Sequence, residues 1–176
     1  GSDGAGYRLA KSLGHTIVLT TPALTPLLTD DPDWKSLSGI TLAVELSLLA
    51  DGKKTARSEG ALLFTHGGFS GPAVLDLSGA WLRAEAKQKE VVANFLPGKR
   101  EQDLLEEFAA LTATHADRSW RRALARYVPE RLAEVILMKG RIDPKARLDQ
   151  IDKKRRETFL RTFFRHPIPV TGGPEE

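Results

Sequence analysis

Strict alternation of apolar and polar residues marks the clearest extended segment of the chain. From residue 40 to residue 48, every second residue is Ile, Leu or Val, and Thr, Ala, Glu or Ser lies between them. Successive side chains of a strand point to opposite faces, so this pattern predicts a strand with one face against a core. The dipeptide Asp51-Gly52 follows and is typical of a tight hairpin turn. Residues 53–59 are therefore expected to return as an antiparallel strand.

Shorter apolar segments predict further structure in the first half of the chain. Four more strands are expected, at residues 15–19, 23–28, 61–65 and 91–96. Pro22 and Pro26 restrict the first two to sheet edges or bends, because proline cannot donate to a strand ladder. Ahead of them, residues 7–13 predict a short helix that Gly14 ends.

The second half of the chain changes to helical spacing. Apolar residues recur at i, i+4 and i+7 over residues 104–111 and again over 120–127, which predicts two helices with one apolar stripe each. A third helix is expected from Pro129 to Met138, and Asp143-Pro144 predicts the start of a fourth. The last helix is expected over residues 152–165, with four inward apolar residues and a basic remainder.

These patterns predict an α+β chain in which a small antiparallel β-sheet or barrel precedes a helical bundle. The division is expected at Pro97-Gly98, with the β-rich part at residues 15–98 and the helical part at residues 99–166. Charge follows the same division. Residues 1–88 carry a net charge of −1, whereas residues 99–166 contain 17 Lys and Arg against 11 Asp and Glu, a net of +6.

The composition is that of an ordinary globular protein and excludes several classes. Hydrophobic residues make up 41% of the 176 residues, and a net charge of +3 is too small to mark the whole chain as a nucleic-acid binder. No apolar run approaches the roughly 20 residues of a membrane span, and no signal-peptide core is present, so a cytoplasmic protein is expected. Without cysteine there are no disulfides or thiolate metal sites, and the histidines lack metal-ligand spacing.

The segment with the richest chemistry begins where an apolar run reaches Thr65 and His66. A glycine pair follows, and Ser70 is placed to cap a helix begun by Gly71-Pro72. Free N–H groups at a helix start attract anions, and glycines allow another group to approach the backbone closely. The alternative is structural: a strand end, a cap of about 1 kcal/mol and a turn. The local chemistry alone favours this structural interpretation.

Residues 64–73, FTHGGFSGPA, closely resemble a signature of bacterial BaiN/RdsA-type flavoproteins, a family of aminoacetone oxidase-like NAD(P)/FAD-dependent enzymes. Residues 1–7 and 13–17 resemble the family's glycine-rich opening and its LGHTI continuation, in the same order. Residues 170–173, VTGG, resemble the point where family chains return to their FAD-binding domain. The resemblance covers nearly the whole chain.

The dinucleotide fingerprint of such flavoproteins, a strand followed by GxGxxG and a helix, is missing here. The resemblance therefore implies an inserted, substrate-side domain of an FAD-dependent oxidoreductase, which is not expected to be active alone. Residues 1–14 and 167–176 would then lie at the junctions with the parent's FAD-binding domain. The parent would use FAD, with NAD(P)H as a candidate reductant, and this chain alone is expected to hold neither.

The resemblance also implies roles for individual residues. His66 would be a proton donor or orienting group facing the substrate, with Thr65 and Ser70 beside it. The backbone positions implied near the flavin are Gly4, Gly6 and Gly71. The first two equally fit a simple tight entry to a helix. Asp3 and Ala5 stand where the family usually has Thr and Asp, so a contact from that Asp side chain cannot form here.

Two alternatives from other classes remain open. The chain could be an RNA-binding module that presents a base for flavin-dependent reduction, or a purely structural or interaction domain. The candidate phosphate contacts are Arg118, Arg121 and Arg122 in one cluster and Lys153, Lys154, Arg155 and Arg156 in another. Such clusters are also typical of solvated helix faces.

Overall fold

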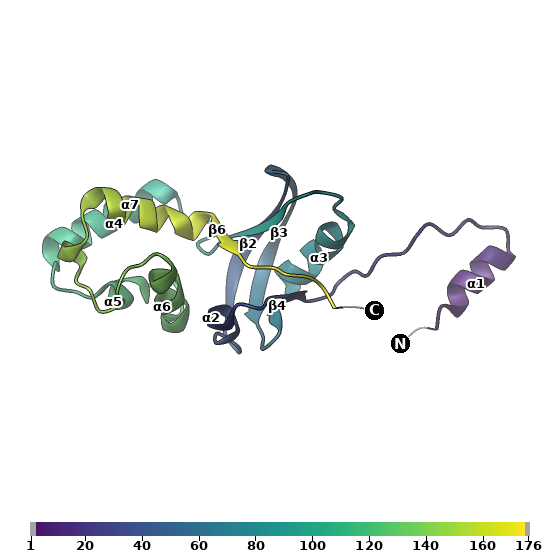
Figure 1. Cartoon of the computed structure of the whole chain (residues 1–176). Coiled ribbons are helices and arrows are strands. Elements are labelled where there is room, and N and C mark those ends of the chain that lie inside the picture. Colours follow the sequence, from purple (N-terminus) through teal and green to yellow (C-terminus); the bar gives the residue numbers. More distant parts are fainter. Residues whose placement is uncertain (1–2, 175–176) are drawn as a thin grey trace.

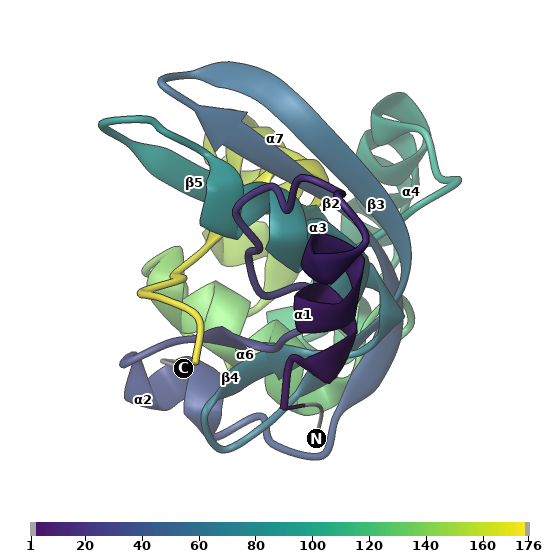
Figure 2. The same ribbon diagram turned by 90° about the vertical axis from the view of Figure 1, so that its right-hand side faces the viewer.

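A computed structural model describes residues 3–174, and Gly1 and Ser2 of the family-like opening lie outside them. Six strands form one antiparallel sheet in the order β1-β4-β3-β2-β5-β6. They are β1 (Leu27–Leu28), β2 (Thr41–Ala50), β3 (Lys53–Phe64), β4 (Gly68–Ser70), β5 (Lys89–Asn94) and β6 (His166–Ile168). Figure 2 shows the long strands β2 and β3 curving along one side of the molecule.

The segment after β6 joins the two edges of this sheet. The Leu28 N–H donates to the Gly172 carbonyl at 2.7 Å, and the Thr171 N–H donates to the Leu28 carbonyl at 2.9 Å. Edge strand β1 is thereby paired with the continuation of edge strand β6, so the sheet closes into a small barrel. Leu28 and Gly172 consequently lie side by side.

The other secondary-structure elements of residues 3–174 are seven α-helices and two 3₁₀ turns. Figure 1 shows their arrangement. They are α1 (Ala5–Ser12), α2 (Pro32–Lys35), α3 (Pro72–Arg83), α4 (Glu101–Thr114), α5 (Trp120–Leu124), α6 (Glu130–Lys139), η1 (Leu148–Gln150), α7 (Lys153–Arg161) and η2 (Thr162–Phe164). Helix α3 packs against β2 and β3, and α4 to α7 form the helical part beside the barrel (Figure 1). The predicted α+β class is confirmed. No helix within residues 3–174 is long and apolar enough to cross a bilayer.

The core runs through both parts as a single buried cluster, and its largest fully buried side chains are aromatic. In the barrel, Trp34 stacks on Phe64 with 6.0 Å between ring centroids. In the helical part, Trp120 stacks on Phe108 at 5.6 Å and meets the edge of Phe159 at 5.5 Å. The sheet and the helices therefore support each other through one continuous apolar interior.

Strong local periodicity predicted several elements correctly. The alternating segment forms β2, and Asp51 and Gly52 both have positive φ, 48° and 78°, as a two-residue hairpin turn requires. Helices α4, α6 and α7 are present as expected, although the last turn of α7 is the 3₁₀ turn η2. Helix α5 ends at Leu124, before the predicted limit at residue 127.

Two strand predictions near the N-terminus were wrong. Residues 15–19 form no strand, and of residues 23–28 only Leu27 and Leu28 pair with the sheet. Val18 and Leu19 are 80% and 93% exposed, so the end of this apolar segment is not packed against the described core. Residues 61–65 were expected as a separate strand, but residues 61–64 continue β3 without a turn.

The fourth predicted helix, beginning at Asp143-Pro144, is also absent. The Asp143 carboxylate instead accepts the Lys145 N–H at 2.8 Å and closes a turn. The chain then runs alongside the start of α5, where the Trp120 N–H donates to the Ala146 carbonyl at 2.9 Å. This carbonyl satisfies a helix-start N–H group that has no partner inside its own helix.

Candidate functional site

The turn between β3 and β4 carries Thr65 and His66, two of the three polar residues of the signature. Thr65 closes this turn, because its hydroxyl accepts the Gly68 N–H at 3.1 Å and its own N–H donates to the Gly68 carbonyl at 2.8 Å. His66 lies exposed at the tip and has no hydrogen-bond or ion-pair partner among residues 3–174. The turn is thus held by hydrogen bonds on either side of His66, and the His66 imidazole is exposed to solvent.

The glycines of the signature allow close backbone packing in the barrel. A Cβ on Gly68 would lie 2.3 Å from the Leu27 carbonyl oxygen in β1. A Cβ on Gly71 would lie 2.6 Å from the Ala61 carbonyl oxygen in β3, and Gly71 also has a positive φ of 89°. Both positions therefore need glycine for the fold itself.

Ser70 does not cap the following helix, which corrects the sequence-based expectation. It is the last residue of β4, and the N-cap position of α3 is Gly71, with no side-chain cap. The Gly71 carbonyl accepts the N–H groups of Val74 and Leu75 at 3.0 and 2.9 Å, and Pro72 has no N–H. These groups are not available to an anion, whereas the partly exposed Ser70 hydroxyl has no partner within the described residues.

Gly4 and Gly6 lie at the start of α1, a helix that stands apart from β3 and β4 (Figure 1). Gly4 is the N-cap residue with a φ of 75°, and Gly6 lies in the first helical turn. The Asp3 carboxylate accepts the Ala5 N–H at 3.0 Å and pairs with Arg8 at 3.0 Å. These contacts hold the Asp3 pKa below its usual value. The structure does not bring these glycines together with Thr65, His66 and Ser70.

Only part of the predicted basic surface is available to phosphates. Arg121 is paired with Glu130 and Glu134 at 3.0 and 2.9 Å, which links α5 to α6 and raises the Arg121 pKa. Arg156 is only 8% exposed, and its Nε is buried without a hydrogen-bond partner within residues 3–174. These two side chains belong to the internal structure of the helical part.

The other predicted basic residues face solvent to different degrees. Lys153 lies 3.9 Å from Glu157, and the Arg155 guanidinium donates to the Arg141 carbonyl at 2.6 Å. Three cations, Arg118, Arg122 and Lys154, have neither an ion-pair partner nor a side-chain hydrogen bond among the described residues. These three are the strongest candidates for binding phosphates.

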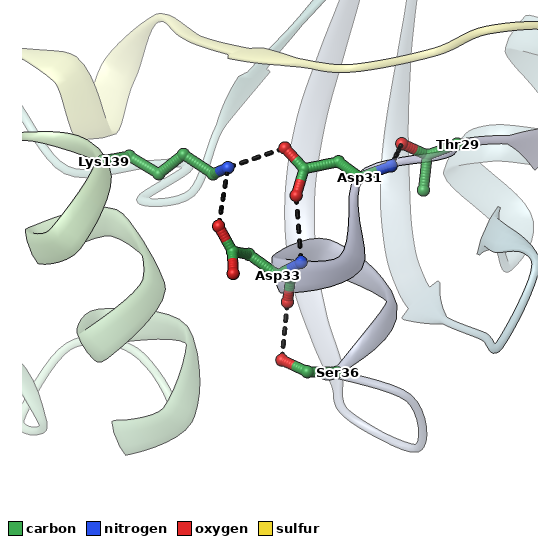
Figure 3. Close-up of polar contacts among 5 residues, drawn as sticks. All are labelled: Thr29, Asp31, Asp33, Ser36 and Lys139. Carbon is green, nitrogen blue, oxygen red and sulfur yellow. Dashed lines mark hydrogen bonds and ion pairs between the residues drawn. The ribbon is translucent and has the colours of Figure 1, made fainter.

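A polar junction between the barrel and the helical part was missed by the sequence analysis. The Lys139 ammonium of α6 binds Asp31 at 2.6 Å and Asp33 at 3.0 Å, as Figure 3 shows. Asp31 also caps α2 through the Asp33 N–H at 2.9 Å. The hydrogen bond from Lys139 helps to hold the Asp31 pKa below its usual value. This ion-pair cluster fixes α6 against the barrel, and Lys139 lies more than 100 residues along the chain from both aspartates.

His166 of β6 lies close to this junction and is 9% exposed. Its ring packs 5.4 Å from the Trp34 ring, and its Nδ1 is buried with no partner in the described part of the chain. Burial and the nearby Lys139 charge lower the His166 pKa from 6.5 to about 4. The imidazole is therefore neutral at pH 7.

This low pKa predicts a decrease in stability in mild acid. The unfolded chain takes up a proton on His166 more readily than the folded chain does, so the free energy of unfolding should fall between about pH 6.5 and pH 4, by about 3 kcal/mol in all. Urea unfolding across this range should show a smaller decrease for His166→Phe. The exposed-site variant His115→Gln should follow the wild type, and a parallel decrease in all three proteins would contradict the assignment.

Comparison with known proteins connects the barrel and the helices to one family. The family described as "HI0933-like protein barrel and H2TH domain" matches residues 21–175. The chain belongs to this family. The resemblance noted in residues 64–73 is thereby confirmed, and the HI0933-like match covers both the barrel and the helical part.

Three relatives of this HI0933-like chain have stated activities. This chain is 30% identical to the ribosomal RNA dihydrouridine synthase of Escherichia coli over 164 aligned residues. The alignment covers 93% of this chain and 38% of that protein. The Haemophilus influenzae protein of the same name is 29% identical, covering 77% of this chain and 31% of the relative. A 3-dehydro-bile acid delta(4,6)-reductase of Clostridium scindens is 30% identical, covering 67% and 28%. The chain thus spans well under half the length of these relatives.

Proposed function

We propose that this HI0933-like chain is the substrate-side domain of an FAD-dependent oxidoreductase and is inactive alone. The observation that carries the proposal is its match along 93% of its length to a relative of which it makes up only 38%. In such a protein the remaining chain would supply the cofactor site, and this domain would cover the reacting face of the cofactor.

The fold of the chain supports the proposal that the cofactor site lies in the parent's remaining chain. Every strand pair in the described residues is antiparallel, whereas a dinucleotide-binding unit needs parallel strands joined through a helix. The residues present therefore do not fit an FAD pyrophosphate site, and the parent's remaining chain would hold FAD and any NAD(P)H.

Helix α1 near the N-terminus supplies a surface that suits contact with the parent's FAD-binding domain. Helix α1 has no buried residue, and Figure 1 shows it standing away from the barrel. Tyr7 and Leu9 of this helix and its C-cap residue Leu13 are 55%, 62% and 71% exposed. Exposed apolar side chains in this number are typical of an interaction surface. We assign this surface to the parent's FAD-binding domain, so that Gly4 and Gly6 would approach the flavin as part of the contact.

The signature turn would face the substrate. His66 is our candidate proton donor for a reduced product, with the hydroxyls of Thr65 and Ser70 available to orient the substrate. In the full-length parent, His66→Ala should lower the rate of flavin reoxidation by substrate by about 100-fold. Because His66 is exposed and unpartnered, the melting temperature should stay within about 2 °C.

Stopped-flow flavin absorbance, with ribosomal RNA as electron acceptor, measures this rate. His115→Ala, at an exposed site in the helical part, is the matched control and should turn over normally. An unchanged rate for His66→Ala, or a rate that falls only in step with stability, would make His66 a structural residue.

Our second candidate function is RNA binding, with RNA as the substrate that this same domain would hold. The helical part has a net charge of +6, and Arg118, Arg122 and Lys154 have no ion-pair partner within residues 3–174. Two relatives are named as ribosomal RNA dihydrouridine synthases. RNA binding by these cations would release counterions and weaken steeply with salt.

Charge reversal tests this directly. Arg122→Glu combined with Lys154→Glu should weaken RNA binding and lower the magnitude of the log–log salt slope by roughly 0.7 to 0.9 for each phosphate that the variant no longer neutralises. The control is Lys53→Glu with Lys87→Glu, two exposed cations on the barrel that also lack ion-pair partners among the described residues. Equal salt slopes for both double variants would show that the helical cations are only solvated surface.

A further inference from the structure

Residues 15–19, His-Thr-Ile-Val-Leu, run from α1 toward the barrel without regular structure (Figure 1). Within residues 3–174, no backbone N–H or carbonyl of residues 16–24 makes a hydrogen bond. The first hydrogen bond to the barrel along the chain is from the Thr25 N–H to the Ser78 hydroxyl, at 3.1 Å. β-Branched and apolar residues are typical of strands. The segment thus has the composition of a strand, and the described part of the chain offers it no sheet to join.

The side-chain pattern indicates which kind of sheet would accept this segment. Ile17, Val18 and Leu19 are consecutive, so a strand formed here would present apolar side chains on both faces. Such unbroken apolar runs are typical of parallel sheets that helices cover on both sides, whereas the barrel strand β2 alternates. The segment therefore fits a strand position inside an α/β domain better than a further position in the antiparallel barrel.

Helix α1 precedes this segment at the spacing of a helix–strand unit. The helix ends at Ser12, and Gly14, with a φ of 87°, turns the chain before His15. Helix and strand are usually joined by about two to six residues in such units. A helix of 8 residues is marginally stable alone in water, and α1 buries no residue. Its exposed Tyr7 and Leu9 match a helix that covers one face of a sheet.

Residues 5–19 lie outside the barrel and helical part that the HI0933-like family match covers, because that match begins at residue 21. The Escherichia coli relative is much longer than this chain, which covers 38% of it. A dinucleotide-binding unit consists of parallel strands and helices, and the proposed function assigns such a unit to the parent's remaining chain. It would supply a sheet of the kind that this segment requires.

We propose that residues 5–19 complete the parallel sheet of the parent's FAD-binding domain, with residues 15–19 added as a strand and α1 covering one face. The identity of this partner rests on the proposed function. Strand addition gives the unpaired N–H and carbonyl groups their hydrogen bonds, and covering both faces removes Ile17, Val18 and Leu19 from water. The barrel is then joined to the FAD-binding domain through a shared sheet as well as through the surface of α1.

Hydrogen exchange measured by mass spectrometry compares the full-length parent with the 176-residue chain. In the chain alone, the amides of residues 16–19 should exchange at the rate of an unstructured peptide, because they have no hydrogen-bond partner. In the parent they should exchange at least about 100-fold more slowly, because the ladder must open first. Residues 44–48 of β2 are the internal control and should be protected in both proteins.

Val18→Pro tests the strand itself, because proline has no N–H and interrupts a sheet ladder. In the parent it should abolish the protection of residues 16–19 and lower the melting temperature by about 5 °C or more. In the 176-residue chain, where Val18 is 80% exposed, the melting temperature should not change. Val18→Ile keeps a β-branched apolar side chain and should leave both proteins unchanged.

Fast exchange of residues 16–19 in the parent, or an unchanged melting temperature of its Val18→Pro variant, would overturn the proposal. Protection in the 176-residue chain that increases with its concentration would also overturn it, since the strand would then pair with a second copy. If residues 16–19 exchange freely while the parent still needs this domain for turnover, only the strand assignment is wrong. If they are protected and the domain is dispensable for turnover, the strand assignment stands and the proposed function fails.

Discussion

Replacing Gly68 by alanine is expected to lower the free energy of unfolding by about 4 kcal/mol. The added Cβ would lie 2.3 Å from the Leu27 carbonyl oxygen and 2.9 Å from the Leu28 Cα. Both atoms belong to the backbone of β1, so they cannot move aside without breaking the β1–β4 pairing. The φ of 149° at Gly68 adds backbone strain for any L side chain.

Gly67→Ala is the matched control from the same turn. A Cβ at Gly67 would meet only the Leu28 Cδ2 atom, at 3.6 Å, which is an ordinary contact. Its effect should stay within about 0.5 kcal/mol. Urea unfolding of both variants measures the difference, and similar stabilities for the two would refute the tight packing of β4 on β1.

Local periodicity predicted those elements whose own residues specify them. The alternation that ends at Leu48 and the Asp51-Gly52 turn gave β2 and its hairpin, since strand faces and turn type are encoded within a few residues. The prediction failed at residues 15–19, where apolar residues have no strand beside them in the described structure. It failed at Asp143 because carbonyls after it bond to the distant start of α5. Both outcomes depend on contacts with segments distant in sequence, which a local pattern of residues does not predict.

For the signature segment, residues 64–73, local sequence also could not decide between a structural and a functional interpretation. In the structure, the two interpretations concern different residues. Gly68 and Gly71 are required by backbone packing, whereas the exposed His66 side chain has no hydrogen-bond or ion-pair partner within residues 3–174 and stays the candidate for chemistry. Ser70 could not be assigned locally, because the β4 pairing moves the helix cap to Gly71.

The polar junction between the barrel and the helical part was missed because its residues are distant in sequence. His166 was considered only as one of the histidines that lack metal-ligand spacing, although His166 and Ile168 share the buried face of β6 around an exposed Pro167. That alternation was the available signal. The pairing of Lys139 with Asp31 had no local signal at all.

Removing most of this domain from the full-length parent is expected to abolish substrate turnover while FAD stays bound. Leu28 and Gly172 are joined by a backbone hydrogen bond of 2.7 Å, so a short flexible linker can replace residues 29–171. The shortened parent should keep its FAD-binding domain and still be reduced by NADH or NADPH. Its reduced flavin should lack substrate positioning and the proposed proton donor His66, so reoxidation by substrate should slow by at least about 1,000-fold.

The decisive measurement is the flavin content of this shortened parent, followed by anaerobic stopped-flow absorbance of its reduced flavin after mixing with unmodified ribosomal RNA. A substrate-side domain predicts near-stoichiometric FAD, normal reduction by NADH or NADPH, and flavin that stays reduced in the presence of RNA. Reoxidation by RNA at the rate of the intact parent would contradict that role and make the domain a structural attachment.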